Sequence, residues 1–427
     1  MTAKSSALTS DDPRYKEMFN VEKEIEHSGG VMIPDPYPDF ARLRSQGSVF
    51  AGSLMMELTG RPDHTSPQRK HFTALSFNAC SKALVEADKF SSAHYQEQDS
   101  VMKNIGHTVL TMIGNEHARY RAAVQPMMTR DQAMGWWTEM WIEPFVQILL
   151  DGIEGQGAVD LVPQLCGRLP MHTVTAAYGL DSNEALEFRD SLLTSMAPVL
   201  PEAARAVAHE KVRQVLLGAI AERRAERRDD LISRMIDAPF TDAAGQASHL
   251  DDEAILSFSR LLLLAGGGTT FRQLGITLFA LLSNRDQLEA LRADRSLMPQ
   301  AIEESVRWNC TDPLFYRMAM SDTVLDGHEI PEGAIIDCCL GAANRDPDRW
   351  ERPDDYDLHR PAKRHVGFAA GPHTCLGRFV AAAEMTAAIN ALLDRFPKMR
   401  LDDSGESTSI IGGLVARGVN HLRVRLN

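Results

Sequence analysis

The sequence predicts a mainly α-helical fold with a small β portion late in the chain. Helix-like segments fill most of residues 110–300, and the longest of them covers residues 251–283. Residues 311–340 instead show short apolar alternations separated by glycine turns, which are typical of strands. Of the 427 residues, 44% are hydrophobic and 24% are charged, an ordinary balance for a folded globular protein. We therefore expect a large apolar core rather than a disordered chain.

The expected helices follow a polar N-terminal segment. Residues 1–50 are polar, and we expect loops there. Three acidic residues at 251–253 mark the start of the central helix, because carboxylates favour the positive end of the helix dipole. The other helices are expected at Asn115–Met128, Gln132–Ile153, Glu184–Leu193, Ala203–Arg227, Asp229–Ile236, Pro299–Trp308 and Leu376–Phe396.

The expected strands lie at Thr323–Leu325 and Ala334–Cys339, and a short β-like tail covers Leu414–Leu426. No linker rich in proline, glycine or serine divides the chain, and no internal repeat stands out. We therefore expect one large domain that covers residues 1–427.

The charge balance excludes one class of function. Lysine and arginine number 45 and aspartate and glutamate 58, so the net charge is −13, whereas a protein held by nucleic-acid phosphates needs a basic surface. The longest apolar runs, such as Leu261–Ala265, are much shorter than a membrane-spanning helix requires. The N-terminus lacks the apolar segment of a signal peptide. We expect a cytoplasmic protein that contacts neither nucleic acid nor membrane.

Among the six cysteines, Cys375 has the most informative surroundings, the segment 368–377 with the sequence FAAGPHTCLG. It precedes a predicted helix, whose positive end and free N–H groups favour a thiolate over a thiol. Gly371 and Gly377 allow tight turns and the close approach of a flat ligand, and Phe368 would shield the sulfur. A shielded thiolate on such a loop suits a soft metal ligand such as haem iron. The alternative is a cysteine that serves only packing.

The spacing Phe368-x-x-Gly371-x-His373-x-Cys375-x-Gly377 resembles the haem-binding signature of the cytochrome P-450 family. The residue after the phenylalanine is usually glycine in that family and is alanine here, so we expect the loop to survive with slightly different backbone angles. The resemblance implies the cytochrome P-450 fold, with haem b (iron protoporphyrin IX) between the central helix and the cysteine loop. It also implies that Cys375 binds the iron of a haem-thiolate monooxygenase of bacterial type.

The segment Glu304–Arg307 matches the ExxR motif of the same family. An isolated i,i+3 pair of this kind stabilises a helix by only about 0.2–0.5 kcal/mol. The resemblance implies a different role, in which Glu304 and Arg307 join a third residue and brace the cysteine loop. Arg360 fits that third place. The residues Ala342–Pro347 resemble the family's stretch before the loop.

Four further residues are implied as partners of the haem, chiefly of its propionate groups. His117 and Arg121 match the HxxxR motif, and their spacing of four places them on one helix face, where they would bind a carboxylate. Arg317, near the start of the first predicted strand, and His373 are implied in the same role. The alternatives are a solvated helix face for the first two and an ordinary loop histidine for His373.

The central helix carries the segment Ala265–Thr270, which resembles the family's oxygen-side motif of Ala-Gly-x-acid-Thr-Thr except that Gly268 replaces the acid. Each of its three consecutive glycines costs about 1 kcal/mol in a helix relative to alanine, so we expect a local kink or opening. The resemblance places Ala265 against the haem. It makes Thr269, beside Thr270, the residue that hydrogen-bonds oxygen and orders a water. Without the acid, water beside Gly268 carries the protons, another side chain substitutes, or the enzyme departs from standard oxygenation.

The substrate pocket is expected where residues 85–110, residues 184–205 and the central helix meet the first strand and the tail. Its expected lining residues are Leu261, Leu264, Ala265, Pro313, Leu314, Phe315, Leu414 and Val415. These are apolar on balance, and the chain has 19 methionines, whose flexible side chains fill irregular cavities. We expect a hydrophobic small molecule such as a terpenoid, steroid, fatty acid or aromatic compound.

The resemblance also implies reaction partners. We expect O₂, a ferredoxin and an NAD(P)H-dependent ferredoxin reductase, because no room for a flavin reductase follows the cysteine loop, and we expect a monomer. Lys363, Arg364 and Arg378 flank the loop and would form a basic docking patch, or else are ordinary surface charges.

Two other interpretations stay open. The first keeps the haem but changes the reaction to a peroxide-driven oxygenation or to tailoring chemistry such as coupling, desaturation or rearrangement, and the missing acid at Gly268 motivates it. The second is a non-enzymatic haem sensor, against which the presence of Thr269 and an apolar helix face argue.

Overall fold

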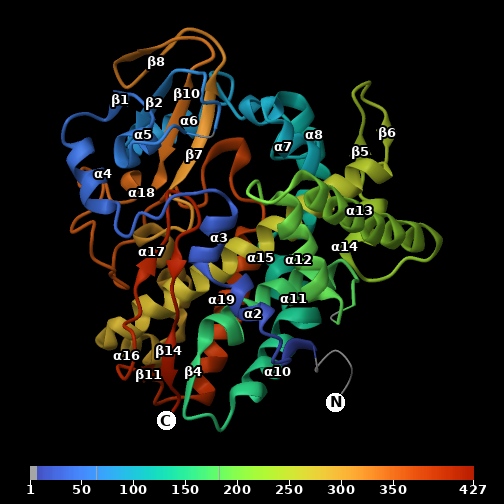
Figure 1. The fold of residues 1–427 in the computed structure, drawn as a ribbon, viewed down its shortest axis with the longest axis vertical. Coiled ribbons are helices and arrows are strands. Elements are labelled where there is room, and N and C mark those ends of the chain that lie inside the picture. Colours follow the sequence, from blue (N-terminus) through green and yellow to red (C-terminus); the bar gives the residue numbers. More distant parts are fainter. Residues whose placement is uncertain (1–6, 64, 182) are drawn as a thin grey trace.

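The computed structural model describes residues 7–63, 65–181 and 183–427. Helices make up most of the chain, and a small sheet lies at one side of the helical part (Figure 1). The predicted fold class, mainly α with a small β portion, is confirmed. The longer helices are α8 (Gly114–Val124), α10 (Glu143–Ile153), α11 (Arg168–Ala177), α12 (Ala185–Met196), α13 (Glu202–Ala225), α15 (Asp252–Ser283), α16 (Arg285–Ala293), α17 (Met298–Trp308) and α19 (Arg378–Arg395).

The shorter helices occupy the N-terminal third and a few connections. They are α2 (Arg14–Met18), α3 (Val21–His27), α4 (Tyr37–Arg44), α5 (Leu54–Thr59), α6 (Phe77–Val85), α7 (Asp99–Asn104), α9 (Arg130–Gln132), α14 (Leu231–Asp237) and α18 (Leu340–Ala343).

The main sheet has five strands in the order β1-β2-β10-β7-β3. Their bounds are Val49–Ala51 (β1), His71–Ala74 (β2), Phe90–Ser91 (β3), Leu314–Ala319 (β7) and Ile335–Cys339 (β10). The pairing of β10 with β2 is parallel and that of β10 with β7 antiparallel, so the late strands join partners from early in the chain. Most strands do lie late in the chain, as predicted, but the early strands β1 to β3 were not predicted, because strands of two to four residues are too short to show a period.

The smaller sheets tie the ends of the chain together. β14 (Arg423–Arg425) pairs with both β11 (Arg400–Leu401) and β4 (Ala158–Asp160). The two-stranded pairs are β5 (Phe240–Thr241) with β6 (Ala247–Ser248), β8 (Thr323–Leu325) with β9 (His328–Ile330), and β12 (Ile410–Ile411) with β13 (Gly418–Val419).

The prediction of loops for residues 1–50 is wrong over the described part of that segment, while its first six residues lie outside the described residues. Three short helices, α2, α3 and α4, form there. They contain few apolar side chains, but these are buried: Tyr15, Val21 and Phe40 are each 1% exposed. Asn20 caps α3 by accepting the Lys23 N–H at 3.0 Å. The high polar content hid these helices because each buries at most three apolar residues.

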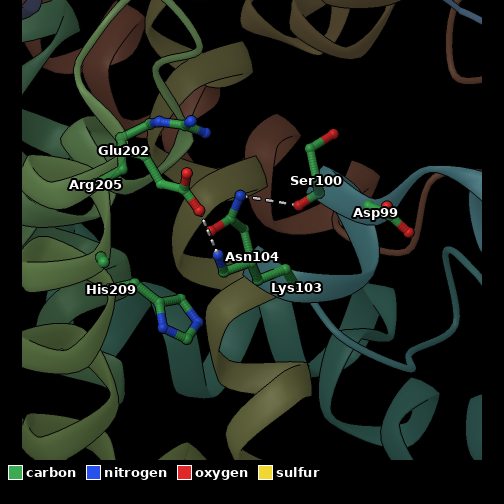
Figure 2. A pocket seen from close by; sticks show the side chains of 8 residues that line it. Asp99, Ser100, Lys103, Asn104, Glu202, Arg205 and His209 are labelled. Atoms are coloured by element: carbon green, nitrogen blue, oxygen red, sulfur yellow. Dashed lines mark hydrogen bonds and ion pairs between the residues drawn. The ribbon is translucent and has the colours of Figure 1, made fainter.

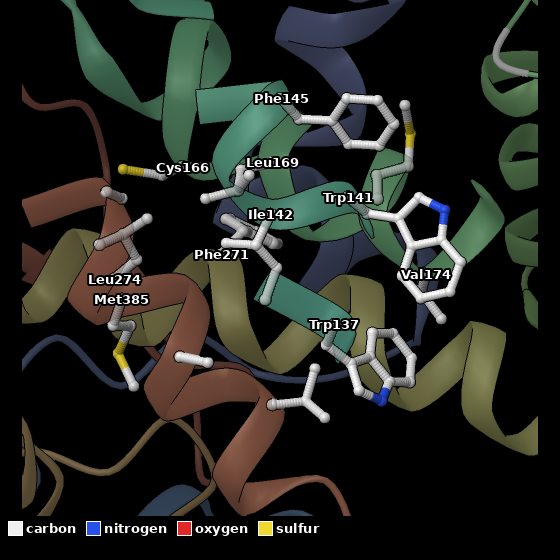
Figure 3. Packing of buried hydrophobic residues seen from close by; sticks show 14 of the residues in the cluster. Trp137, Trp141, Ile142, Phe145, Cys166, Leu169, Val174, Phe271, Leu274 and Met385 are labelled. Carbon is white, nitrogen blue, oxygen red and sulfur yellow. The ribbon is translucent and has the colours of Figure 1, made fainter. Parts of the chain in front are cut away.

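The helix expected at Gln132–Ile153 is divided into two kinds of helix. Residues Ala133–Ile142 form a π-helical segment, and the regular α10 follows with Pro144 in its first turn. Trp137 and Trp141 pack edge to face with ring centroids 5.5 Å apart. Figure 3 shows both rings within the main apolar cluster. The sequence period predicted a helix but not its wider winding.

α15 is the longest helix, with 32 residues, and it packs against α11, α17 and α19. It begins where the sequence predicts, with Asp251 as the N-cap that accepts the Ala254 N–H at 2.8 Å. Its hydrogen bonding is α-helical throughout, so the glycines at 266–268 do not interrupt it. By length and hydropathy, α15 and the segment Gly371–Arg395 would each suit a membrane span, but 61% of the apolar stretch of α15 is buried inside the fold. That is the position of a core helix.

A buried charge network connects α17 to the segment that leads to Cys375. Arg307 donates to both carboxylate oxygens of Glu304, at 2.7 and 2.8 Å, and Arg360 donates to the same carboxylate at 3.0 Å. Arg307 also donates to the carbonyl oxygen of Asn344 at 3.0 Å. The Asn344 side chain in turn accepts the Val366 N–H at 2.9 Å. The structure thus brings Glu304, Arg307 and Arg360 together directly beneath the cysteine loop.

Removing the carboxylate from this network should destabilise the protein strongly. We expect Glu304→Gln to lower the free energy of unfolding by about 3–5 kcal/mol, because two buried guanidinium groups lose their counter-charge. Urea unfolding followed by circular dichroism measures the loss. The matched control is Glu289→Gln, which removes a half-exposed carboxylate from another i,i+3 pair with Arg292. That control should cost at most about 1 kcal/mol, and equal losses in the two variants would contradict the assigned role.

Candidate functional site

The cysteine loop, residues 368–377, is closed by its own backbone. The Cys375 N–H donates to the Phe368 carbonyl oxygen at 2.9 Å, and the Thr374 N–H donates to the Gly371 carbonyl oxygen at 3.1 Å. The Ala369 N–H donates back to Val366 at 2.8 Å. Helix α19 begins at Arg378, so Cys375 lies three residues before the helix.

Ala369 takes a left-handed backbone conformation, with φ of +57°. Glycine adopts this conformation freely, whereas a Cβ collides with the following carbonyl oxygen, which costs about 1–2 kcal/mol. The neighbouring Ala370 is extended, with φ of −150°, and is fully buried. The loop therefore forms with an alanine at the second position and stores strain at that one residue.

The two glycines of the loop have different environments. Gly371 has φ of +71°, and a Cβ there would overlap the Leu84 carbonyl oxygen and lie 2.9 Å from the Val85 Cα. It is needed where the loop crosses the end of α6. Gly377 has φ of −84°, and a Cβ there would meet no atom within 4 Å. Gly377 thus leaves a cradle beside Cys375 that a flat ligand can enter.

Cys375 is exposed, whereas the other five cysteines are buried. Protein atoms nevertheless surround its sulfur closely enough that burial raises the pKa of the thiol. The backbone N–H groups of Gly377 and Arg378 and the guanidinium of Arg121 oppose this rise. The expected preference for thiolate therefore depends on a partner for the sulfur, and a metal ion is such a partner because it deprotonates a coordinating thiol.

Four basic side chains gather on one side of the loop. His117 and Arg121 extend from α8, Arg317 from β7 and His373 from the loop itself. The rings of His117 and His373 lie 4.1 Å apart between centroids, and Arg121 donates to the Thr374 carbonyl oxygen at 2.7 Å. Among the described residues, no carboxylate forms an ion pair with any of the four.

The positive charge of this cluster comes from its two arginines, and no carboxylate among the described residues balances it. Burial lowers the pKa of His117 to about 4 and that of His373 to about 3, with Arg121 adding to both shifts and Arg317 to the second. Both imidazoles are therefore neutral near pH 7. His117 Nε2 is buried without a hydrogen-bond partner among the described residues. An anionic ligand at this place would accept from the arginines and from the unpaired imidazole.

A fifth member of the cluster, His94, was missed in the sequence. It follows β3, is completely buried, and neither of its ring nitrogens has a hydrogen-bond partner among the described residues. Burial, with the charge of Arg317, lowers its pKa to about 3. Nearby, Ser92 Oγ lies 3.1 Å from His373 Nε2. The sequence FSSAH at residues 90–94 does not by itself predict a binding site. Its role becomes visible only because the structure places Ser92 and His94 beside the loop.

The oxygen-side segment of α15 faces several different neighbours. Ala265 is exposed, and the Thr269 hydroxyl donates to its carbonyl oxygen at 2.9 Å. Thr270 is buried and borders a cavity of about 50 Å³, together with Gly266 and with Gly377 of the loop. The cavity places the glycine segment of α15 directly across from the start of α19. Gly268 is buried on another side of the helix.

A second cavity, of about 180 Å³, lies between α7 and α13. Figure 2 shows Asn104 and Lys103 facing Glu202, with Lys103 Nζ 3.6 Å from the Glu202 carboxylate. Residues 85–110 and 184–205 therefore meet, as two of the predicted pocket walls should. Most of the lining residues are polar or charged, but they face the cavity chiefly with their apolar atoms.

The predicted lining residues divide into two groups. Leu261 and Leu264 are partly exposed on α15, Phe315 is partly exposed on β7, and Val415 is 42% exposed. Pro313, Leu314 and Leu414 are buried instead, the last two in a packed cluster with Phe40. Their place in the pocket wall stays a prediction. Side chains alternate along a strand, so Leu314 faces the core when Phe315 faces the other side.

The comparisons with known proteins agree with this geometry. Residues 183–415 match the family model of cytochrome P-450. A cytochrome P-450 of Xylella fastidiosa, 133B2, is 35% identical over 89% of this chain and 93% of its own length. The chain belongs to the cytochrome P-450 family. It is accordingly an oxidoreductase of the haem-thiolate monooxygenase type, and it binds haem, iron protoporphyrin IX, through a cysteine thiolate.

Two further relatives extend the comparison. The 6-deoxyerythronolide B hydroxylase of Saccharopolyspora erythraea is 32% identical over 73% of this chain and 76% of its own length. The bacillaene polyketide synthase cytochrome P-450 of Bacillus subtilis has the same fold, with a TM-score of 0.80 over 95% of this chain and 98% of its own, at 24% identity.

The residues of the loop region fit the haem of the family. An exposed thiol supplies a soft ligand, the free space at Gly377 accommodates a flat ring, and the basic cluster with its orphaned imidazole nitrogens matches two carboxylates.

The strain at Ala369 gives a testable consequence. We expect Ala369→Gly to raise the free energy of unfolding by about 0.5–1 kcal/mol, because relief of the left-handed strain exceeds the added chain entropy of glycine. The matched control, Ala370→Gly, should lower it by about 1 kcal/mol, since that residue is extended and buried. Urea unfolding of the three proteins measures both changes, and a destabilised Ala369→Gly variant would contradict the strain argument.

Proposed function

We propose that Cys375 is the thiolate ligand of the haem iron, and that the haem lies between the cysteine loop and α15. One observation carries this assignment: the single exposed cysteine stands beside two arginines and two neutral histidines, and none of the four has a carboxylate partner among the described residues. Bound there, the haem supplies oxygen activation, which a thiolate ligand promotes by donating electron density.

The other residues have roles that follow from their positions. His117, Arg121, Arg317 and His373 bind the two propionates, as predicted from the motifs. On the opposite side, Thr269 offers a hydroxyl, now bonded to its own helix, that orients oxygen and a water molecule. Buried arginines are well suited to carboxylates because a guanidinium donates two parallel hydrogen bonds.

The proposed reaction inserts one atom of O₂ into a C–H bond of a hydrophobic small molecule. Leu261 and Leu264 present apolar surface near Ala265. A relative that is named as a hydroxylase of 6-deoxyerythronolide B supports hydroxylation.

The electrons for this reaction come from a ferredoxin and its NAD(P)H-dependent reductase, in the cytoplasm, with the protein acting as a monomer. Lys363, Arg364 and Arg378 are exposed near the cysteine loop, and none of them forms an ion pair in the described part of the chain. Free cations at this place attract an acidic electron carrier despite the overall charge of −13.

A second candidate keeps the haem but takes its oxygen from peroxide, or performs coupling or desaturation. Gly268, where the family usually has an acid, is the observation that favours it. Peroxide already contains reduced oxygen and two protons, so this reaction has less need of a proton relay.

The identity of the ligand can be tested by the spectrum of the reduced carbon-monoxide complex. Wild-type protein should show the Soret band typical of thiolate ligation, and Cys375→Ala should lose it because no other cysteine is exposed. Cys166→Ala is the control, since Cys166 is buried in the core and should leave the band in place. Loss of the band in the control but not in Cys375→Ala would overturn the assignment.

The electron donor can be tested by charge reversal in the basic patch. Arg364→Glu should lower the ferredoxin-driven rate on the order of tenfold at low salt, because electrostatic steering is lost. The control Lys398→Glu reverses an exposed charge on another part of the chain and should leave the rate unchanged. Peroxide-driven turnover should be equal in all three proteins. Product with peroxide but none with ferredoxin would establish the second candidate.

A further inference from the structure

Gly268, the residue that replaces the acid, lies beside a buried group of charges. A Cβ on Gly268 would lie 3.4 Å from Arg189 Nη2, 3.9 Å from Arg272 Nη1 and 4.0 Å from Glu24 Oε1. These side chains come from three different elements: Arg189 from α12, Arg272 from α15 itself and Glu24 from α3, near the N-terminus (Figure 1). The place where an acidic side chain would extend from position 268 is therefore surrounded by charges.

Arg189 is a buried cation that has no carboxylate partner among the described residues. It is 5% exposed, and its Nη1 donates to the carbonyl oxygens of Leu263 and Leu264 on α15, at 2.7 and 3.2 Å. Its Nε has no partner in the described part of the chain. Burial lowers the pKa of Arg189 to about 10, while the charge of Glu24 acts in the opposite direction. A Cβ on Gly267 would lie 2.9 Å from this guanidinium, so that glycine makes room for it.

Glu24 reaches this group from the surface. Its Oε1 forms an ion pair with Arg272 Nη1, which is 248 residues away in the chain. Its Oε2 is buried and has no hydrogen-bond partner among the described residues. The side chain as a whole is 29% exposed. One part of the carboxyl group is thus held beside Gly268, while the side chain remains in contact with solvent.

Asp312, the other carboxylate on Arg272, is less suited to move a proton. Its Oδ1 lies 3.5 Å from Arg272 Nη2 and accepts the Ala416 N–H at 2.9 Å. Its Oδ2 accepts the Thr311 hydroxyl at 3.2 Å. Both oxygens are engaged in holding the C-terminal loop, whereas Glu24 has a free oxygen.

We propose that Glu24 supplies the carboxylate of the proton relay that the sequence lacks at position 268. The proposal rests on the proposed monooxygenase function. Insertion of one oxygen atom of O₂ into a C–H bond leaves the other atom as water, so each turnover consumes two electrons from NAD(P)H and two protons. Glu24 takes each proton from solvent water as its carboxylate becomes a carboxylic acid. It then gives the proton to water beside Gly268, which passes it to the Thr269 side of α15, and Glu24 returns to the carboxylate.

The arginines position this carboxylate rather than carry the proton. Arg272 fixes Oε1 through an ion pair, and Arg189 places a second positive charge close to Gly268. Glu24 is accordingly a relay residue that acts through water and Thr269, without contact with substrate.

The test compares Glu24→Gln with Glu22→Gln in the haem-loaded protein. Glu22 is exposed on the same helix and makes none of these contacts, so its variant is the matched control. Glu24→Gln should reduce product formed per NAD(P)H on the order of 10- to 100-fold, with a larger solvent isotope effect, since a positioned acid contributes at least that factor. The reduced carbon-monoxide band should stay unchanged in both variants.

A rescue variant separates the relay from a structural role. Gly268→Asp placed in the Glu24→Gln background puts a carboxylate beside Arg189, so coupling and the isotope effect should return towards wild-type values. The melting temperature provides a second measurement that does not depend on turnover. It should fall in Glu24→Gln, because Arg272 loses its ion pair, and rise again in the double variant, because Arg189 gains a partner.

Each outcome decides the proposal. Unchanged coupling and isotope effect in Glu24→Gln, with a normal carbon-monoxide band, would overturn the relay while leaving the monooxygenase function intact. Lower stability without any change in coupling would show that Glu24 is purely structural, which overturns it as well. Absence of the thiolate band in the wild type would instead refute the proposed function itself.

Discussion

The buried carboxylate of Glu304 is the constraint on which the cysteine loop depends. It balances two guanidinium groups, those of Arg307 and Arg360, in a place where an unpaired charge would be very costly. Because Arg307 also holds the Asn344 carbonyl, and Asn344 holds Val366, the network fixes the backbone that enters the loop. A strained, glycine-rich turn can then present an exposed sulfur without collapsing onto its neighbours.

The long helices and the chemistry-bearing motifs could be predicted because their signals are local. The 32 residues of α15 and the spacing around Cys375 can be read directly from the chain. The strands β1 to β3 and the helices α2 to α4 could not, since each contains too few apolar residues to show a period. The burial of single side chains on β7 could not be predicted either, because the strand is apolar on both faces, with Leu314 in a packed cluster and Phe315 partly exposed.

Positive charge without a carboxylate partner recurs on both sides of the proposed haem position. Arg317 lies by the loop, near the neutral and buried His94, and Arg189 lies behind α15. Burial disfavours the charged form of His94 and of Arg189 and lowers the pKa of both. Such groups are maintained at a cost in stability, which is typical of functional sites. Near the loop the balancing anions fit the propionates, while behind α15 the nearest one is Glu24.

A proton relay needs a carboxyl oxygen at a given point in space. Any residue that places its carboxyl group there can supply it, whatever its position in the sequence. If residue 268 carried an acid in the wild-type chain, its carboxylate would stand next to that of Glu24, and two like charges would compete for Arg189 and Arg272. The glycine avoids this repulsion and leaves Arg272 paired with Glu24, with Arg189 close by. The missing acid at position 268 and the ion pair between Glu24 on α3 and Arg272 on α15 are therefore linked. The carboxylate that the motif lacks comes from a distant part of the sequence.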